Sequence, residues 1–315
     1  MTQPFKRVSS LTEIEEKKPT YLAVGVFDGV HRGHQALLHE MAAAAEAENA
    51  RAAVLTFFPH PIAVIRRLTG RLYLSTLEER VALLKEQGLS LVITYPFDET
   101  VRQTRAADFV NQLCHHLNMT QLWGGSFSLG YNREGDLPFL QAHGRENGYS
   151  VHHYEALLEW EVEPVSSSRI RRELAAGNMT AVNGCLGRPY SLTGTVVQGE
   201  GRGRTIGIPT ANIHTWEEQH LPANGVYAAV ATVGGKSYTA ATNIGVRPTV
   251  DGHNQTVEAH LLDFDGNLYD KEVTLDFVGR IRDEQKFPSL DALVAQIKAD
   301  IAKTRQIVSS LPTNH

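Results

Sequence analysis

The chain has 315 residues, 42% of them hydrophobic, and a formal net charge of −5. This length exceeds that of an ordinary single domain, so we expect two domains, each with its own core. The negative charge argues against a general nucleic-acid binder, and no apolar run reaches the ~20 residues of a membrane helix. The two cysteines form no zinc spacing and no disulfide framework, and the N-terminal segment lacks a signal-peptide core, so we expect a cytoplasmic protein.

The first half of the sequence alternates strand-like and helix-like segments. The apolar runs that predict strands are Tyr21–Val24, Ala52–Phe58, Leu89–Phe97 and Thr120–Phe127. Segments with helical spacing or strong helix formers occupy 36–48, 75–88 and 106–118. This alternation predicts an α/β, Rossmann-like domain, with a parallel sheet and helices on both faces.

A polar cluster follows the first of these strands, in the stretch GVFDGVHRGHQ, Gly25–Gln35. His34 falls near the first turn of the next helix, where a phosphate meets free backbone N–H groups and the positive end of the helix dipole. His31 and His34 can donate hydrogen bonds to a triphosphate as charge builds up on it, which suits nucleotidyl transfer. Taken alone, the two histidines are also compatible with an accidental surface pair.

A second candidate phosphate site is the stretch VSSSRIRREL, Val165–Leu174. Serines that cap a helix, followed by Arg169, Arg171 and Arg172, can hold a polyphosphate. A capped surface helix with solvated arginines is the alternative interpretation. The stretch FFPHP, Phe57–Pro61, ends a strand with two prolines and means little by itself.

After about Gly187 the pattern changes to short β-rich segments. They are LTGTVVQ, GVYAAVATV, KSYTAATNIG, VEAHLLDF and KEVTLDFVG, with turn pairs at Gly234-Gly235 and Asp265-Gly266. This predicts a small antiparallel β-barrel. A closing helix follows, with Ser289 as N-cap and an apolar stripe of Leu290, Leu293, Val294, Ile297 and Ile301. We place the boundary between domains 1–185 and 186–315.

A glycine-rich and basic stretch, GEGRGRTIGIPTAN, runs from Gly199 to Asn212. It contains no Gly-Lys-Ser/Thr, so it is not a Walker A loop, and it does not fit GxGxxG. A flexible surface loop is the plain interpretation. The PTAN that ends it, Pro209–Asn212, supplies a hydroxyl and a carboxamide that can bind Mg²⁺ and nucleotide phosphates.

Four motifs occur in order: GVFDGVHRGHQALL, LTFFPHP, SSSRIRREL and LGRPYSLTGTV. With them the chain resembles the prokaryotic bifunctional FAD synthetases over nearly its whole length. In that family an HxGH nucleotidyltransferase module is fused to a riboflavin kinase barrel. The resemblance implies an ATP-dependent enzyme in which 1–185 transfers AMP from ATP to FMN, giving FAD and pyrophosphate. Residues 186–315 would phosphorylate riboflavin to FMN, and both steps would use Mg²⁺.

The resemblance also assigns roles to residues. The catalytic residues it implies are His31, His34 and Glu258. Nucleotide binding falls to Phe27, Asp28, Gly29, Gly33, Ser167, Ser168, Arg171, Gly199, Gly201, Arg204, Gly207, Thr210 and Asn212, with Thr210 and Asn212 also on the metal. Flavin binding falls to Ser126, Arg282 and Phe287. By residue pattern alone, Glu258 also fits an outward-facing strand residue and Phe287 fits ordinary packing.

The sequence departs from the family pattern in GGSFSLG, Gly124–Gly130. Ser126 stands where the family has aspartate, Ser128 where it often has arginine, and Leu129 where it has an aromatic residue. Arg80 stands where a lysine is common. One alternative is therefore an enzyme with kinase activity only and a degenerate first domain. A non-enzymatic flavin- or nucleotide-binding regulatory protein is the other.

Overall fold

The structure is a computed structural model, and it describes residues 4–155, 158–199, 203, 206–249 and 252–311. The chain folds into two compact units, Met1–Val165 and Ser166–His315. Residues 166–185, which the sequence suggested as the end of the first domain, thus belong to the second unit. The assignment of one activity to each side of residue 185 stays a prediction.

The first unit is built on one parallel sheet. Its strands are β1 (Lys6–Val8), β2 (Thr20–Gly25), β3 (Arg51–Phe58), β4 (Leu91–Pro96), β5 (Met119–Gly124) and β6 (Ser150–His153), in the order β1-β4-β3-β2-β5-β6. Every neighbouring pair is parallel, which confirms the predicted sheet. The winding reverses between β2 and β5, and such a switch point is where open α/β sheets bind ligands.

Strand β5 is shorter than the sequence suggested, because the chain turns away after Gly124. The Phe127 ring folds back so closely that a Cβ on Gly124 would lie 2.8 Å from it. Residues 125–127 therefore lie outside the sheet.

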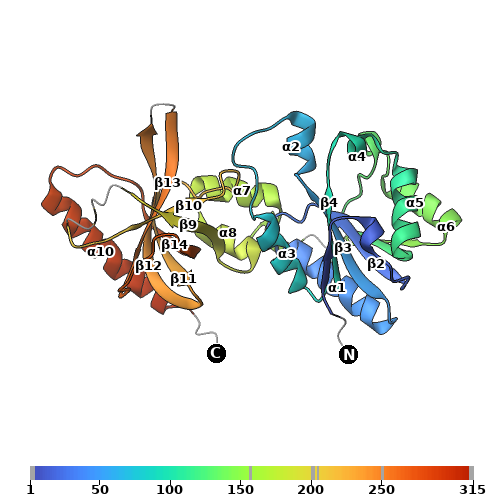
Figure 1. Cartoon of the computed structure of the whole chain (residues 1–315), viewed down its shortest axis with the longest axis horizontal. Helices are drawn as coiled ribbons and strands as arrows, with labels where there is room; N and C mark the ends of the chain where they lie inside the picture. Colours follow the sequence, from blue (N-terminus) through green and yellow to red (C-terminus); the bar gives the residue numbers. More distant parts are fainter. Residues whose placement is uncertain (1–3, 156–157, 200–202, 204–205, 250–251, 312–315) are drawn as a thin grey trace. The chain divides into compact units, whose positions relative to one another are not determined.

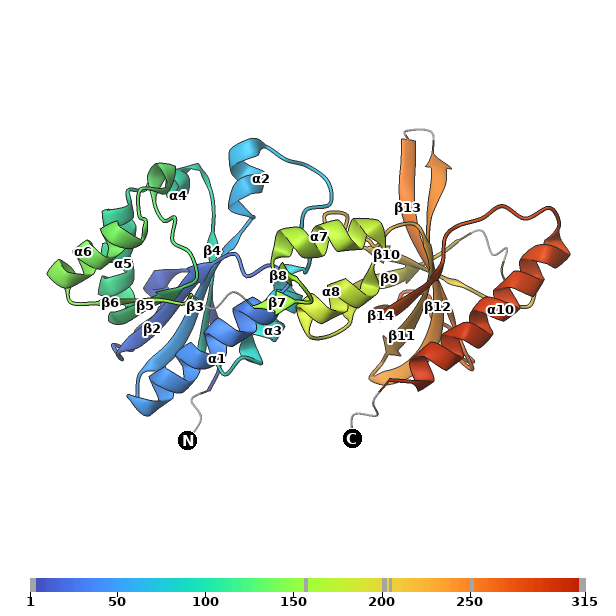
Figure 2. The same ribbon diagram turned by 180° about the vertical axis from the view of Figure 1, so that it is seen from behind.

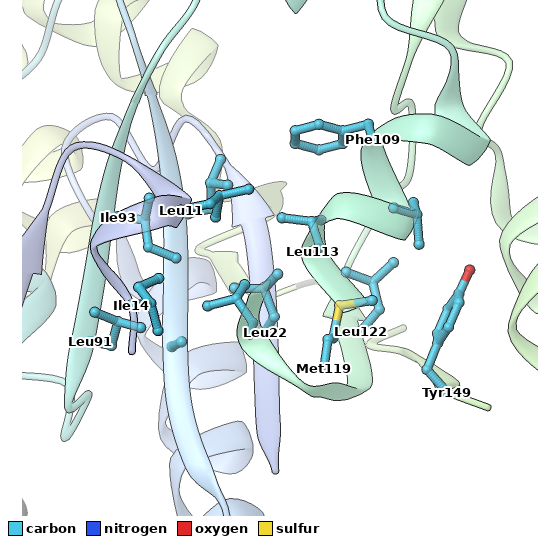
Figure 3. Close-up of a cluster of buried hydrophobic side chains, with 14 of the residues drawn as sticks. Leu11, Ile14, Leu22, Leu91, Ile93, Phe109, Leu113, Met119, Leu122 and Tyr149 are labelled. Carbon is cyan, nitrogen blue, oxygen red and sulfur yellow. The ribbon is translucent and has the colours of Figure 1, made fainter. Parts of the chain in front are cut away.

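Helices pack on both faces of this sheet (Figures 1 and 2). They are α1 (Arg32–Ala47), α2 (Pro61–Arg66), α3 (Leu77–Lys85), α4 (Glu99–Gln103), α5 (Ala106–Leu117) and α6 (Leu137–Asn147). Figure 3 shows the core on one face, where Phe109 and Leu113 of α5 pack toward strand residues such as Leu22. The other core holds Leu38 and Met41 of α1. Each such buried side chain stabilises the fold by ~1.5–3 kcal/mol.

The second unit is a closed antiparallel barrel, as predicted. Its strands are β9 (Tyr190–Val197), β10 (Ala211–Thr215), β11 (Gly225–Val233), β12 (Lys236–Thr249), β13 (Gly252–Leu261) and β14 (Glu272–Arg282), in the order β10-β13-β12-β11-β14-β9. Gly234 and Gly235, with φ of 55° and 77°, make the tight β11–β12 turn. Asp265-Gly266 instead lies within a longer connection, 262–271. Strand β10 begins inside PTAN and was not expected.

Among the described residues, this unit also contains the helices α7 (Ser167–Ala176), α8 (Met179–Leu186) and α10 (Leu290–Ser309). Asn183 of α8 donates to the carbonyl oxygens of Phe277 and Val278 and accepts from the Tyr190 N–H, which ties α8 to β14 and β9. Ser289 caps α10 as predicted, its hydroxyl accepting from the Ala292 N–H at 3.2 Å. Leu290 was wrongly placed on the packed stripe: it is the first residue of the helix and is 59% exposed.

Within the part of the chain that the structure describes, every helix is too short or too polar to cross a lipid bilayer.

Candidate functional site

The turn between β2 and α1 is tightly wound. Phe27, Gly29 and Val30 have φ of 52°, 76° and 38°, in the region that side chains with a Cβ rarely adopt. Such strain persists only where the surroundings hold it. Here Val30 is fully buried, its N–H donates to the Phe27 carbonyl oxygen (3.1 Å), and its own carbonyl oxygen accepts from Gln35 Nε2 (2.9 Å). The turn is thus held in one shape.

Asp28 anchors this turn from behind. Its carboxylate is 2% exposed and accepts the backbone N–H groups of Leu74 and Ser75 at 3.0 and 3.2 Å. The Ser75 hydroxyl in turn accepts the Gly29 N–H at 3.2 Å. These bonds fasten the segment before α3 to the β2–α1 turn.

Arg80 of α3 completes the anchor from inside the protein. Its side chain is fully buried, and its Nη2 lies 3.5 Å from Asp28 Oδ1. Its Nη1 donates to the Thr56 hydroxyl oxygen (3.3 Å) and the Phe57 carbonyl oxygen (3.2 Å) at the end of β3. A guanidinium can serve these three acceptors at once, whereas a lysine ammonium is a single point donor. The sequence marked Arg80 only as a departure and did not reveal this role.

The two histidines of the motif lie face to face. Their ring centroids are 3.6 Å apart with an interplanar angle of 16°. His31 is the N-cap of α1, and its Nδ1 accepts the backbone N–H of His34 at 3.3 Å. Because Nδ1 is an acceptor, the neutral His31 ring carries its proton on Nε2. A Cβ on Gly33 would lie only 3.2 Å from the His31 ring, so a glycine at this position leaves room for the ring.

His34 is held in its neutral form. Burial lowers its pKa well below the usual value, and the nearby His31 ring and Arg80 guanidinium lower that pKa further. Its Nδ1 is buried, and among the described residues no group makes a hydrogen bond to it. The edge-to-face contact with Phe27, at 5.0 Å between centroids, fixes the ring plane. A neutral imidazole here can donate one hydrogen bond to an anion without carrying a buried charge.

A cavity of about 1150 Å³ opens in front of these rings, at the carboxyl ends of β2, β3, β5 and β6. Of the predicted site residues of this unit, Phe27, His31, Gly33, His34 and Ser126 line it. Its wall also holds aromatic and basic residues, among them Phe57, Phe97, Phe109, Arg66, Arg102 and Arg133. Apolar rings beside cationic side chains suit a ligand with a flat aromatic system and phosphates.

Other predicted residues of this site are not part of the cavity lining. Asp28 is buried behind the turn, in the anchor described above, rather than in the cavity wall. Ser167, Ser168 and Arg171 belong to α7 in the second unit. The capping residue of α7 is Ser166, whose hydroxyl accepts the Arg169 N–H at 3.2 Å. Gly29, in the turn itself, is likewise not in the cavity lining, and contact of these five predicted residues with a nucleotide stays a prediction.

The second unit brings three polar residues into one row across neighbouring strands. Glu258 of β13 is paired in register with Asn212 of β10 and Asn243 of β12. The flanking residues Val257 and Ala259 are 3% and 0% exposed and face the barrel core. Directly paired residues share a face, so Asn212, Glu258 and Asn243 all point outward. The register, which a sequence does not display, is what joins them.

The glycine-rich stretch approaches one end of this row. A Cβ on Gly199 would overlap the Asn212 carboxamide, so only glycine lets the chain pass there. Gly207 has φ of 73°, and the His260 ring Nδ1 lies 2.7 Å from the Pro209 carbonyl oxygen, holding PTAN against β13. Thr210 is exposed beside Asn212. Gly201 and Arg204 lie outside the described residues.

The two predicted flavin-binding residues of this unit contact each other. The Arg282 guanidinium carbon lies 5.6 Å from the centre of the Phe287 ring. Asp300 of α10 accepts from Arg282 Nε at 2.9 Å and lies 2.8 Å from its Nη2, and Gln296 Nε2 donates to the same carboxylate. The end of β14 is thereby fixed to α10.

Known protein families match both halves of the chain. A family model described as FAD synthetase matches residues 13–169, and one described as riboflavin kinase matches residues 186–308. The two matches together cover most of the sequence and leave residues 170–185, most of α7 and α8, between them.

Proteins similar over almost the whole length are known as well. Bifunctional riboflavin kinase/FMN adenylyltransferases from Pseudomonas fluorescens and Escherichia coli K12 are 35% and 38% identical, over 95% and 90% of this chain and 96% and 91% of their own. A crystal structure described as a macrolide-efflux protein from Streptococcus pneumoniae is 29% identical. It covers 96% of this chain and 98% of its own, with a TM-score of 0.86.

Proposed function

Because this chain belongs to the bacterial bifunctional riboflavin kinase/FMN adenylyltransferases, we propose that its two sites divide that work between them. The protein is a transferase that phosphorylates riboflavin with ATP to FMN and adenylylates FMN with ATP to FAD. The match of a family model to each half favours both activities over the kinase-only alternative.

Adenylyl transfer takes place in the cavity of the first unit. An oxygen of the FMN phosphate attacks the α-phosphorus of ATP, and the bond to the leaving pyrophosphate breaks. His31 and His34 donate hydrogen bonds to the phosphate oxygens that gain charge, which stabilises the transition state more than the ground state. Phe27, Gly29 and Gly33 shape the turn that receives the nucleotide. Asp28 anchors that turn to the segment before α3. The stacked histidine pair is the single observation that carries this assignment.

Phosphoryl transfer takes place on the outer face of the barrel. The terminal hydroxyl oxygen of riboflavin forms a bond to the γ-phosphorus of ATP, ADP leaves, and the hydroxyl proton passes to the Glu258 carboxylate. Gly199 and Gly207 belong to the stretch that faces the phosphates, and nucleotide binding by Gly201 and Arg204 stays a prediction. Arg282 and Phe287 border the flavin. The pairing of Glu258 with Asn212 supports this arrangement.

A magnesium ion fits the nucleotide end of the row. The Thr210 hydroxyl and the Asn212 carboxamide are hard oxygen donors on neighbouring positions of the chain. Mg²⁺ prefers few protein ligands and keeps water and phosphate oxygens around it. When bound, it would neutralise charge on the transferring phosphate. We place the enzyme in the cytoplasm, consistent with a sequence that has only two cysteines, far apart in the chain.

One assay tests this division of labour. Purified protein is incubated with riboflavin, ATP and Mg²⁺, and the flavins are separated by chromatography. Wild type should give FMN and then FAD. Glu258→Gln should slow FMN formation by ~10²–10⁴-fold while FAD formation from supplied FMN persists. His34→Ala should do the opposite. A wild type that makes FMN alone would favour the kinase-only alternative, and unchanged riboflavin would contradict both activities.

A further inference from the structure

The row of Asn212, Glu258 and Asn243 has two different ends. Neighbouring strands lie about 4.8 Å apart, so the row spans three adjacent positions on the barrel surface. At the Asn212 end, the glycine-rich stretch closes over the carboxamide at Gly199. The nucleotide and its phosphates belong at this end.

The Asn243 end meets a different segment. A Cβ on Gly245, the next outward position of β12, would lie 3.0 Å from Asn243 Nδ2 and 2.5 Å from Glu284 Oε1. Glu284 follows Arg282 in the segment that also holds Phe287. The flavin-side segment therefore reaches over β12 beside Asn243, on the side of Glu258 away from Asn212.

The Asn243 side chain is half-buried. No hydrogen bond reaches its carboxamide from the residues that the structure describes. A carboxamide can donate and accept at once, which matches the hydroxyl groups of a sugar-like chain. The carboxamide atoms of Asn243 are not among the fully buried polar atoms of the described residues, so a ligand can reach them from outside and take the place of water.

We propose that Asn243 binds the ribityl hydroxyls of riboflavin and holds the chain against Glu258. This inference rests on the proposed kinase function of the barrel. The order along the row is then nucleotide, base and acceptor alcohol. The γ-phosphorus forms its new bond to the ribityl oxygen at the middle position, where Glu258 takes the proton and ADP departs toward Asn212.

The test compares Asn243→Ala with Thr239→Ala in the full-length protein. Thr239 lies on the same face of β12, at the end away from the row, and serves as the matched control. Asn243→Ala should lower kcat/KM for riboflavin by ~10-fold or more, with KM for ATP and FAD formation from FMN unchanged. Thr239→Ala should leave all of these values near those of wild type. A kcat/KM for riboflavin within twofold of wild type in Asn243→Ala would overturn the proposal.

A second variant guards against misfolding. Asn243→Asp keeps the shape of the side chain but removes its N–H donors, so it should lose riboflavin efficiency as well. If both variants lose ATP affinity and thermal stability in parallel with riboflavin efficiency, Asn243 is structural and the proposal is wrong. Failure of the kinase assignment itself would look different, because wild type would then form no FMN at all.

Discussion

The Arg80 guanidinium and the Asp28 carboxylate face each other in the interior of the first unit, with 3.5 Å between Nη2 and Oδ1. Breaking a buried pair leaves a charge without its partner and typically costs ~3–5 kcal/mol. Arg80→Ala should therefore lower the free energy of unfolding of the first unit by about that amount, measured by urea denaturation. Arg80→Lys keeps the charge and should lose less. Equal stability of Arg80→Ala and wild type would contradict the anchor role.

The serines that depart from the family pattern line the cavity and are exposed to it. Ser126→Asp with Ser128→Arg restores groups able to make charge-assisted hydrogen bonds, each worth ~1.5–3 kcal/mol. The double variant should lower KM for FMN in FAD formation by ~10-fold or more, with kcat changed less. Ser150→Asp, at an exposed serine outside the cavity lining, is the control. An unchanged KM for FMN would show that the serines do not limit substrate binding.

The division at residue 166 predicts that the α7–α8 pair supports the barrel. Asn183 makes hydrogen bonds to β14 and β9, and the Ala223 N–H donates to the Leu174 carbonyl oxygen at 2.9 Å. A fragment 166–315 should therefore melt at least ~5 °C above a fragment 186–315, because each lost hydrogen bond costs ~0.5–1.5 kcal/mol. Both fragments should form FMN from riboflavin. A folded 166–315 fragment without kinase activity would contradict the domain assignment.

His34 should make the first unit sensitive to acid. Its pKa is lowered in the folded state, so below about pH 6.5 the unfolded chain binds a proton that the folded chain does not. The stabilisation is fully present above that pH and is lost as the pH falls, by at most ~1.4 kcal/mol per pH unit. His34→Asn removes the titrating group and should flatten this slope in denaturation experiments between pH 7.5 and 5.5. An identical slope in both proteins would argue against a neutral His34 in the folded protein.

Much of the fold follows from the sequence because local signals were strong. The helical spacing in residues 106–118 and the Ser289 N-cap are local patterns, and helices α5 and α10 form where these patterns predict them. Strand β10 could not be predicted from the sequence because its residues lie at the end of a glycine-rich stretch. Only pairing with β9 and β13 makes them a strand.

The candidate site was predictable in its motifs but not in its supports. His31 and His34 can be recognised in the sequence because the two histidines and the glycine between them lie within one short turn. Arg80 reaches that turn from a helix far along the chain, and no local pattern shows that its three acceptors converge. Asn243 joins Glu258 only through the β12–β13 register, which depends on the closed barrel.

Closure of the barrel restricts the movement of the strands that carry the kinase residues. Strands β10, β13 and β12 are hydrogen-bonded on both sides, so none can swing outward without breaking a ladder. The spacing between Asn212, Glu258 and Asn243 is consequently set before any ligand binds. Any conformational change during riboflavin phosphorylation therefore has to occur in the segments that connect the strands, while the strands themselves stay in place.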